Sequence, residues 1–235
     1  MATVIRAENV VKSYRAGDVV VQAVRGVSFA IEAGSFVSFV GPSGSGKTTL
    51  LNLIGCLDRP TSGKLTVLDT DVSTLDRKER ARFRGQNLGF IFQDFNLIPV
   101  LSVYENVEYP LIMVQSWPER RRRDRVMELL AAVGMADQAQ KRPDQISGGQ
   151  KQRVAVARAL APETKIILAD EPTANLDSET AHRVIDLMRR LKTELGVTFA
   201  FSTHDPKIMA EAEIIFHLED GQVKNVEKVR EAAHA

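Results

Sequence analysis

The sequence predicts an α/β fold in which an antiparallel β subdomain precedes the core and a helical subdomain is inserted into it. Apolar runs of strand length alternate with segments whose apolar residues recur at helical spacing, a pattern typical of a parallel sheet covered on both faces. β-Branched and aromatic residues with intervening glycines dominate the first segments, as in antiparallel strands. Between residues 93 and 161 helical spacing continues without a strand pattern, which predicts the inserted helical lobe.

Length and composition set limits on the kind of protein. The 235 residues suffice for one domain, and we expect residues 1–235 to form a single one. The hydrophobic content of 44%, the charged content of 26% and the formal charge of +1 are ordinary for a globular protein and indicate no nucleic-acid partner. Cys56 is the only cysteine, which excludes an internal disulfide and a thiolate metal cluster.

The predicted strands and helices divide the chain. Antiparallel strands are expected over Thr3–Val11 and Val19–Ile31, and a buried strand over Phe36–Val40 leads through a glycine-rich loop into an apolar helix over Thr48–Leu57. Further buried strands are predicted at Leu88–Phe92, Ile166–Ala169, Val197–Ser202 and Ile214–Leu218. We assign residues 1–92 and 162–221 to the core with its β subdomain, 93–161 to the helical lobe, and 222–235 to a polar tail that forms a short helix or frays.

The loop between the third predicted strand and the first helix carries a phosphate-binding motif. Residues 41–48 match G-x-x-x-x-G-K-[ST], in which glycines let the backbone N–H groups and the helix N-terminus point at the β- and γ-phosphates. Lys47 adds a positive charge and Thr48 an oxygen ligand for Mg²⁺. The motif predicts a P-loop NTPase (RecA-like) core. The predicted nucleotide-binding residues here are Gly41, Pro42, Ser43, Gly44, Ser45, Gly46, Lys47, Thr48 and Thr49.

Two adjacent carboxylates end a later apolar strand. Asp170 and Glu171 follow Ile166–Ala169, and an acid at the end of a buried strand beside a phosphate loop can hold the Mg²⁺ shell. We assign Asp170 to the metal. Glu171, one residue further on, can face the water that attacks the γ-phosphate, and we predict it as the general base.

A second glycine turn stands before a predicted helix. Ser147, Gly148, Gly149 and Gln150 follow Ile146, and their N–H groups at a helix N-terminus form an anion site able to hold a γ-phosphate. This turn resembles the signature sequence of the ABC ATPases, with Ile146 in place of the usual leucine. The three motifs occur in the order found in that family, and the resemblance covers nearly the whole chain.

The resemblance implies further site residues. Tyr14 corresponds to the aromatic residue that stacks on adenine, Gln93 to the residue that meets Mg²⁺ and the attacking water, and His204 to the histidine that contacts the γ-phosphate. Asp177 lies in the family's D-loop, Asn175-Leu-Asp177. Taken alone, a tyrosine can simply pack, a glutamine can cap a turn, and a histidine can serve only as a hydrogen-bonding group.

The family resemblance also implies an assembly. In ABC ATPases the signature turn of one subunit closes over the phosphate loop of another, and this chain has one copy of each motif. We therefore expect two copies to sandwich two ATP molecules in a head-to-tail dimer of C₂ symmetry, with Ser147 acting across the interface.

Two segments indicate a branch of the family. Residues 93–107 and 54–63 resemble the lipoprotein-releasing (LolD-like) and macrolide-exporting (MacB-like) ATPases, whose permeases have large extracytoplasmic domains. The resemblance implies an ATPase that powers a separate membrane permease for export, lipoprotein release or mechanotransmission, peripheral at the cytoplasmic face of the inner membrane. Apolar residues after Gln93 either line a groove for the permease or pack in the core. Arg120–Arg123 begin a solvated helix or meet lipid headgroups or the permease.

Two other functions are compatible with parts of the pattern. An ABC ATPase that regulates cell division without transport would carry the same motifs. An ABC protein of DNA repair or translation would show a coiled-coil insertion, tandem cassettes or a basic nucleic-acid surface, and we see none of these in the sequence.

Overall fold

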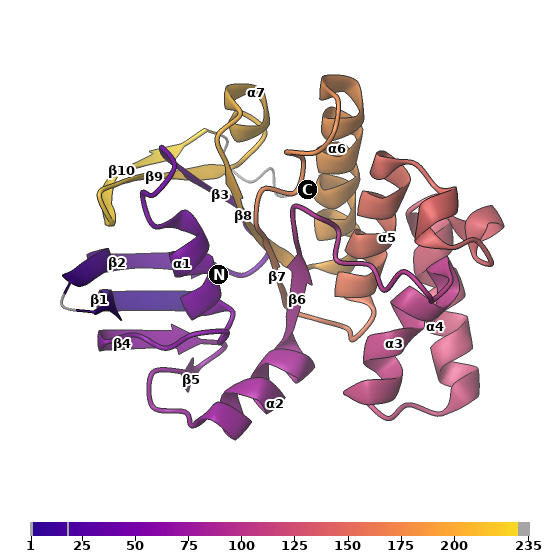
Figure 1. The fold of residues 1–235 in the computed structure, drawn as a ribbon, viewed down its shortest axis with the longest axis horizontal. Coiled ribbons are helices and arrows are strands. Elements are labelled where there is room, and N and C mark those ends of the chain that lie inside the picture. The colour runs from indigo at the N-terminus through magenta and orange to yellow at the C-terminus, as the bar shows by residue number, and fades with distance from the viewer. Residues whose placement is uncertain (1, 18, 230–235) are drawn as a thin grey trace.

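The computed structural model describes residues 2–17 and 19–229 (Figure 1). Its core is a six-stranded sheet with the order β10-β9-β3-β8-β7-β6, in which β9, β3, β8, β7 and β6 run parallel. The parallel strands are β3 (Phe36–Val40), β6 (Leu88–Ile91), β7 (Ile166–Ala169), β8 (Thr198–Thr203) and β9 (Ile214–Glu219). Every residue of β3, β7 and β8 is buried, which explains why these strands read as unbroken runs of mainly apolar residues.

A second sheet confirms the predicted antiparallel subdomain. Its order is β2-β1-β4-β5, and its strands are β1 (Thr3–Ala16), β2 (Val19–Glu32), β4 (Ser62–Val67) and β5 (Thr70–Asp71). All of its pairings are antiparallel. The α/β fold with an N-terminal antiparallel subdomain therefore matches the prediction.

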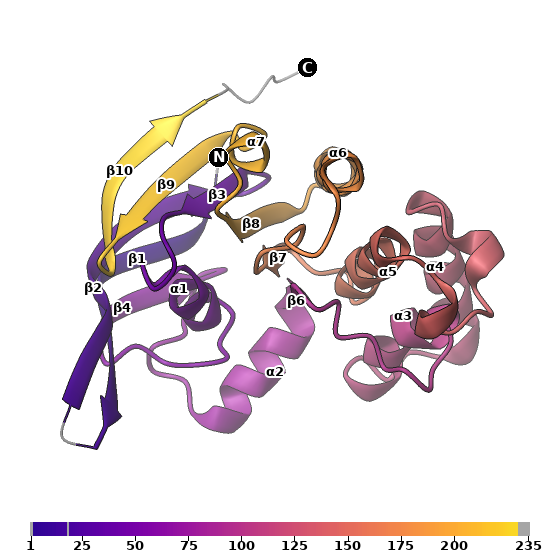
Figure 2. The same cartoon turned by 45° about the horizontal axis from the view of Figure 1, so that its top comes forward.

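Helices cover both faces of the core sheet. They are α1 (Lys47–Ile54), α2 (Arg77–Asn87), α3 (Val103–Met113), α4 (Glu119–Ala132), α5 (Gly148–Leu160), α6 (Ser178–Leu195) and α7 (Pro206–Met209), with short 3₁₀ turns at Ala136–Gln138 and Pro143–Gln145. Residues 93–161 hold α3, α4 and α5 and no strand, and Figure 2 shows these helices gathered away from the antiparallel sheet. Within the described residues, no helix combines the length and apolar character needed to cross a membrane.

The apolar core consists of two clusters, one on each face of the sheet. Val37 and Phe39 of β3 face a cluster built from α1 and the antiparallel strands. Phe36 and Val40 of the same strand face a cluster built from α3, α4, α5 and α6. Because β3 anchors both clusters, the loop that follows it has a fixed position relative to both lobes.

The C-terminal segment differs from the prediction. Residues after Gly221 were expected as a short helix or a frayed tail, but Gln222–Lys228 form strand β10, antiparallel to β9. Asp220 and Gly221 have φ values of 49° and 75°, the backbone of a tight hairpin turn, and the Asp-Gly pair suits it. The prediction was wrong because backbone hydrogen bonds hold β10 while its side chains are mostly exposed. Residues 230–235 lie outside the described part of the chain.

The arginine run at the start of α4 makes contacts within the helical lobe. The Arg121 guanidinium lies over the Trp117 ring, 3.5 Å from its centroid, and pairs with Glu163 at 3.3 Å. Arg122 pairs with Glu108 at 2.9 Å, and both side chains are largely buried. Two of the four arginines thus have partners in the same chain, which favours the interpretation of a helix start over one in which the run meets lipid headgroups or the permease.

The β9–β10 turn gives a test of the fold. In Gly221→Ala the left-handed backbone costs about 1–2 kcal/mol, and the new Cβ would lie 2.8 Å from the carbonyl oxygen of Ala23. Gly196→Ala is the matched control, since Gly196 has a φ of 64° at the end of α6 and open space around its Cβ position. Urea denaturation should show a larger loss of unfolding free energy for Gly221→Ala. Equal losses would contradict the close packing of this turn on β2.

Candidate active site

The phosphate loop, residues 41–46, follows β3. At two positions the backbone of the loop lies so close to a carbonyl oxygen of another strand that only glycine fits. A Cβ at Gly41 would lie 2.1 Å from the carbonyl oxygen of Leu218, and one at Gly46 would lie 2.4 Å from that of Ala23. Gly46 is the N-cap of α1 and offers no side-chain acceptor, so the first N–H groups of the helix face the loop without a side-chain cap. The loop therefore forms a backbone cradle suited to phosphate.

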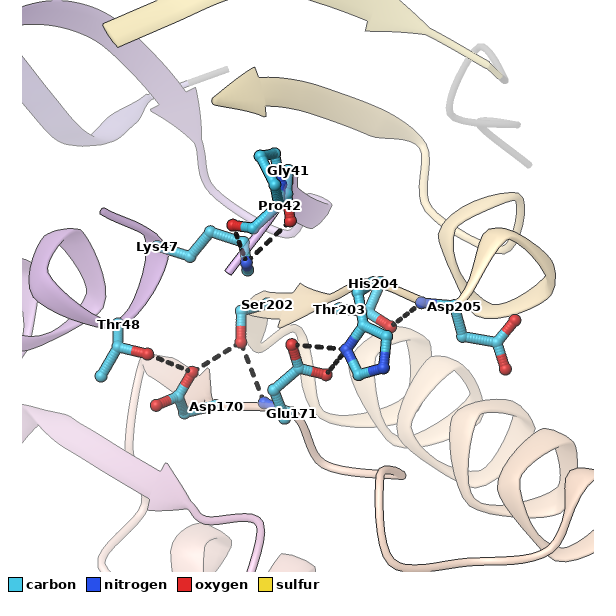
Figure 3. Close-up of polar contacts among 10 residues, drawn as sticks. All are labelled: Gly41, Pro42, Lys47, Thr48, Asp170, Glu171, Ser202, Thr203, His204 and Asp205. Atoms are coloured by element: carbon cyan, nitrogen blue, oxygen red, sulfur yellow. Dashed lines mark hydrogen bonds and ion pairs between the residues drawn. The ribbon is translucent and has the colours of Figure 1, made fainter. Parts of the chain in front are cut away.

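Lys47 bends back over this loop. Its Nζ donates hydrogen bonds to the carbonyl oxygens of Gly41 at 2.8 Å and Pro42 at 3.0 Å (Figure 3). The side chain is largely buried, with 8% of the residue exposed. The ammonium is thus held against the first two residues of the loop, where it adds positive charge to the cradle.

The carboxyl ends of three neighbouring strands bring the other site residues to this loop. Val40 of β3 pairs with Thr203 of β8, and Ala169 of β7 pairs with Phe201 of β8. The residues that follow these strands therefore meet at one edge of the sheet, which is where parallel α/β sheets bind ligands.

Asp170 receives two hydroxyl groups on one oxygen. Thr48 Oγ1 donates to Asp170 Oδ1 at 3.1 Å, and Ser202 Oγ donates to the same oxygen at 2.6 Å. Ser202 Oγ also accepts the backbone N–H of Glu171 at 2.9 Å. Ser202 was not predicted as a site residue. The available signal was a polar residue near the end of an apolar strand, two positions before His204.

Glu171 and His204 face each other (Figure 3). His204 Nδ1 lies 3.0 Å from each carboxylate oxygen of Glu171, whose side chain is 18% exposed, compared with 69% for the histidine. Glu171 has a φ of 47°, an uncommon backbone for a non-glycine residue that tends to occur at functional sites. The carboxylate is therefore fixed in direction by its backbone and by the imidazole.

Gln93 lies in a segment held by two other elements. Asn175 Nδ2 donates to the Gln93 carbonyl oxygen at 3.1 Å and to Asp94 at 3.0 Å. Arg158, near the end of α5, donates to the carbonyl oxygen of Phe95 at 2.8 Å and to that of Asn96. Burial lowers the pKa of the Arg158 guanidinium. A partly buried cation with carbonyl partners thus ties the signature helix to the segment that carries Gln93.

A cleft of about 740 Å³ joins these groups to Tyr14. Its lining includes Tyr14, Lys47, Thr48, Gln93, Glu171 and His204. Tyr14 comes from β1, so the antiparallel sheet supplies one end of the cleft and the phosphate loop the other. Tyr14 is 41% exposed, which leaves its ring available to a ligand.

The oxygen groups around Thr48 fit a magnesium ion. Mg²⁺ prefers oxygen ligands and is usually held by one or two carboxylates together with phosphate oxygens and water. Thr48 and Asp170 supply one hydroxyl and one carboxylate, and their oxygens lie 3.1 Å apart beside the phosphate loop.

The signature turn and Asp177 lie outside this cleft. Ser147 caps α5, where its Oγ accepts the N–H of Gln150 at 3.3 Å and its own N–H donates to Gln150 Oε1 at 2.8 Å. Asp177 caps α6 by accepting the N–H of Thr180 at 2.9 Å. A separate cavity of about 820 Å³ is lined by residues that include Ser147, Gly149, Gln150, Arg153, Thr180 and Arg183. One chain therefore does not bring its signature turn and its phosphate loop into the same cleft.

Comparison with known proteins identifies the family. The family model described as "ABC transporter" matches residues 24–174, well over half of the chain. The chain belongs to the ABC transporter ATP-binding family. It is an ATP-hydrolysing subunit of that class, as the motif order predicted.

Full-length relatives support this assignment. An uncharacterized ABC transporter ATP-binding protein of Thermotoga maritima is 45% identical, with 97% of each chain covered. The dimeric ABC cassette MJ0796 of Methanocaldococcus jannaschii, solved in a post-hydrolysis state with ADP and Pi, has a TM-score of 0.88 and 43% identity over 97% of this chain and 99% of that one.

The predicted resemblance to MacB-like ATPases also has support. The macrolide export ATP-binding/permease protein MacB of Nitrobacter winogradskyi is 46% identical over 93% of this chain. The match covers 34% of that relative, which is a much longer protein. The ABC ATPase therefore corresponds to about one third of such MacB proteins.

Ser202 offers a test of the site geometry. Ser202→Ala removes the hydroxyl that links Asp170 to the Glu171 backbone, and a hydrogen bond to a charged group contributes about 1.5–3 kcal/mol. We expect kcat for ATP hydrolysis to fall on the order of tenfold or more. Ser38→Ala is the matched control, because Ser38 is a buried serine of the same sheet whose Oγ has no hydrogen-bond partner among the described residues. Equal rates in the two variants would contradict the positioning role of Ser202.

Proposed function

We propose that this chain hydrolyses ATP as a head-to-tail dimer and thereby powers a separate membrane permease in export, lipoprotein release or mechanotransmission. The observation that carries the proposal is the position of the signature turn, outside the nucleotide cleft of its own chain. A second copy can complete each cleft. In this proposal residues 1–235 act as one ATPase domain, and the helical lobe of residues 93–161 carries the signature turn.

The proposed nucleotide contacts follow from the cleft. Residues 41–49 surround the β- and γ-phosphates and bind them through their backbone N–H groups, which every residue of the loop except Pro42 has. Lys47 adds charge, and the Tyr14 ring stacks on adenine. Thr48 and Asp170, with Gln93, would hold Mg²⁺, which when bound neutralises charge on the phosphate oxygens.

The proposed reaction is attack of water on the γ-phosphorus. Glu171 accepts the proton of that water on its carboxylate, and Gln93 orients the water. The bond from the γ-phosphorus to the bridging oxygen breaks, which gives ADP and phosphate. His204 contacts the γ-phosphate and holds Glu171, consistent with its 3.0 Å contacts to both carboxylate oxygens.

A dimer supplies the remaining contacts in this proposal. Ser147, Gly148, Gly149 and Gln150 of one copy bind the γ-phosphate held by the other, and Asp177 lies at the interface. The relative MJ0796 is described as a dimer with ADP and Pi, and it is similar to this chain over nearly its full length. A symmetric pair of this kind buries two nucleotides in equivalent sites.

The helical lobe offers apolar surface for the permease. Val100 is 73% exposed and Met113 is 62% exposed, whereas Leu97 packs against the core. Val100, seven residues after Gln93, and Met113, at the end of α3, are exposed apolar groups of the lobe that suit contact with a helix of a membrane protein. The MacB relatives are named as ATP-binding/permease proteins, which supports a permease partner for this chain. In this proposal the chain lies at the cytoplasmic face of the inner membrane. The same relatives disfavour a role in cell division without transport. We further propose that the permease partner has large extracytoplasmic domains.

Glu171→Gln tests the general base. The amide keeps the shape of the side chain but cannot take a proton, and general base catalysis contributes about 10²–10⁴-fold. We expect ATP binding by calorimetry to be kept, the ATP-bound dimer to accumulate, and kcat to fall by that range. Glu163→Gln is the control, since Glu163 is an exposed acid paired with Arg121 and should keep wild-type turnover. Near-normal hydrolysis by Glu171→Gln would refute the assignment.

Ser147→Arg tests the second copy. A long cation at the cap of α5 blocks closure over the partner's phosphate loop and leaves the cleft of its own chain unchanged. Sedimentation should show ATP-bound monomer, with ATP affinity within about twofold of wild type. Ser116→Arg, at an exposed serine of the same lobe, should dimerise normally. An undiminished ATP-dependent dimer of Ser147→Arg would rule out the role of Ser147 across the interface.

A further inference from the structure

Tyr14 is held by two charged groups that have no assigned role. Its hydroxyl donates to Asp58 Oδ2 at 2.9 Å. Lys12 Nζ lies over the ring, 4.8 Å from its centroid, and donates to Asp58 Oδ1 at 2.6 Å. One face of the ring is therefore covered by an ammonium group, and the hydroxyl end is anchored to a carboxylate.

Asp58 is itself firmly placed. Its Oδ1 also accepts the backbone N–H of Arg59 at 2.7 Å, and Lys12 Nζ donates to the Arg59 carbonyl oxygen at 3.0 Å. Burial raises the pKa of Asp58, but the hydrogen bonds from Lys12, Arg59 and Tyr14 outweigh it and hold this pKa below its ordinary value. Asp58 therefore remains a carboxylate at neutral pH and accepts all of these hydrogen bonds.

The position of Asp58 along the chain links the two ends of the cleft. Asp58 follows α1, the helix that begins at Lys47 beside the phosphate loop, and its N–H donates to the Asn52 carbonyl oxygen of that helix at 3.2 Å. Helix α1 thus begins beside the phosphate loop, and the residue that holds Tyr14 lies just beyond the end of the same helix. The spacing between the phosphate cradle and the tyrosine ring is set by α1.

We infer that Asp58 is a positioning residue for the nucleotide base: together with Lys12 it holds the Tyr14 ring so that only the face away from Lys12 is open to adenine. The inference rests on the proposed function of the cleft. A tyrosine that is 41% exposed on a hairpin would otherwise sample several rotamers, and ordering it would reduce the affinity for the nucleotide. Burial and the hydrogen bond to Asp58 raise the pKa of Tyr14, which keeps its hydroxyl a donor.

The test separates base contacts from phosphate contacts. Calorimetry measures the affinity of wild type, Asp58→Ala and Asp58→Asn for ADP and for inorganic triphosphate, which lacks a base. We expect Asp58→Ala to weaken ADP binding by about three- to tenfold and to leave triphosphate binding unchanged. Asp58→Asn keeps an acceptor for Tyr14 but no charge for Lys12 and should lose less. Asp71→Ala is the control: Asp71 ends β5, its carboxylate accepts the Ser73 N–H, and the variant should keep both affinities.

A double variant shows whether Asp58 acts through the ring. In a Tyr14→Ala background, Asp58→Ala should cause no further loss of ADP affinity, because the ring that it positions is gone. Additive losses, an equal loss for triphosphate, or an unchanged ADP affinity in Asp58→Ala would overturn the inference. If Asp58→Ala fails to fold by thermal denaturation, Asp58→Asn makes the same comparison. Wild type that binds neither ligand would instead overturn the proposed function.

Discussion

The phosphate loop depends on two glycines that have no side chain to separate the loop from neighbouring strands. Gly41 lies against the Leu218 carbonyl of β9, and Gly46 lies against the Ala23 carbonyl of β2. The Gly221 N–H donates to the Ser45 carbonyl oxygen at 3.1 Å, and the Gly221 carbonyl accepts the Arg25 N–H at 2.7 Å. The loop is thus wedged between the antiparallel sheet and the β9–β10 hairpin. Side chains at these glycines would push both elements away, so the relative position of the two sheets and the nucleotide cradle share one constraint.

Much of the fold could be predicted because the central strands are buried on both faces. β3, β7 and β8 read as mainly apolar runs, and the glycine motif fixed the order of strand, loop and helix. Several elements were not predicted, and α2 and β10 show why. No residue of α2 is buried, so it lacks an apolar stripe and only its Asp76–Glu79 capping box marks it. β10 is held by backbone pairing, which leaves no side-chain pattern.

The site shows a similar division. Residues that belong to a contiguous motif, such as Lys47 and Glu171, could be predicted because the neighbouring residues of the motif indicate their role. Ser202, Asp58 and Arg158 act on groups that are 32, 44 and 63 residues away in the sequence. Periodicity reports burial and spacing within one element, but it carries no information on which polar groups meet after folding. The contacts that these supporting residues make could be identified only from the structure.

The supporting contacts also give the helical lobe a mechanical connection to the cleft. Helix α5 presents Ser147 at its N-terminus, and near its other end Arg158 holds the carbonyls of Phe95 and Asn96. Asn175, two residues before the cap of α6, holds the Gln93 carbonyl. A rigid shift of α5 that carried Ser147 toward a second nucleotide would therefore pull on the Gln93 segment of its own chain. In the proposed dimer, closure at one cleft and the position of Gln93 in the other would be coupled through the partly buried Arg158 as well as through the nucleotide.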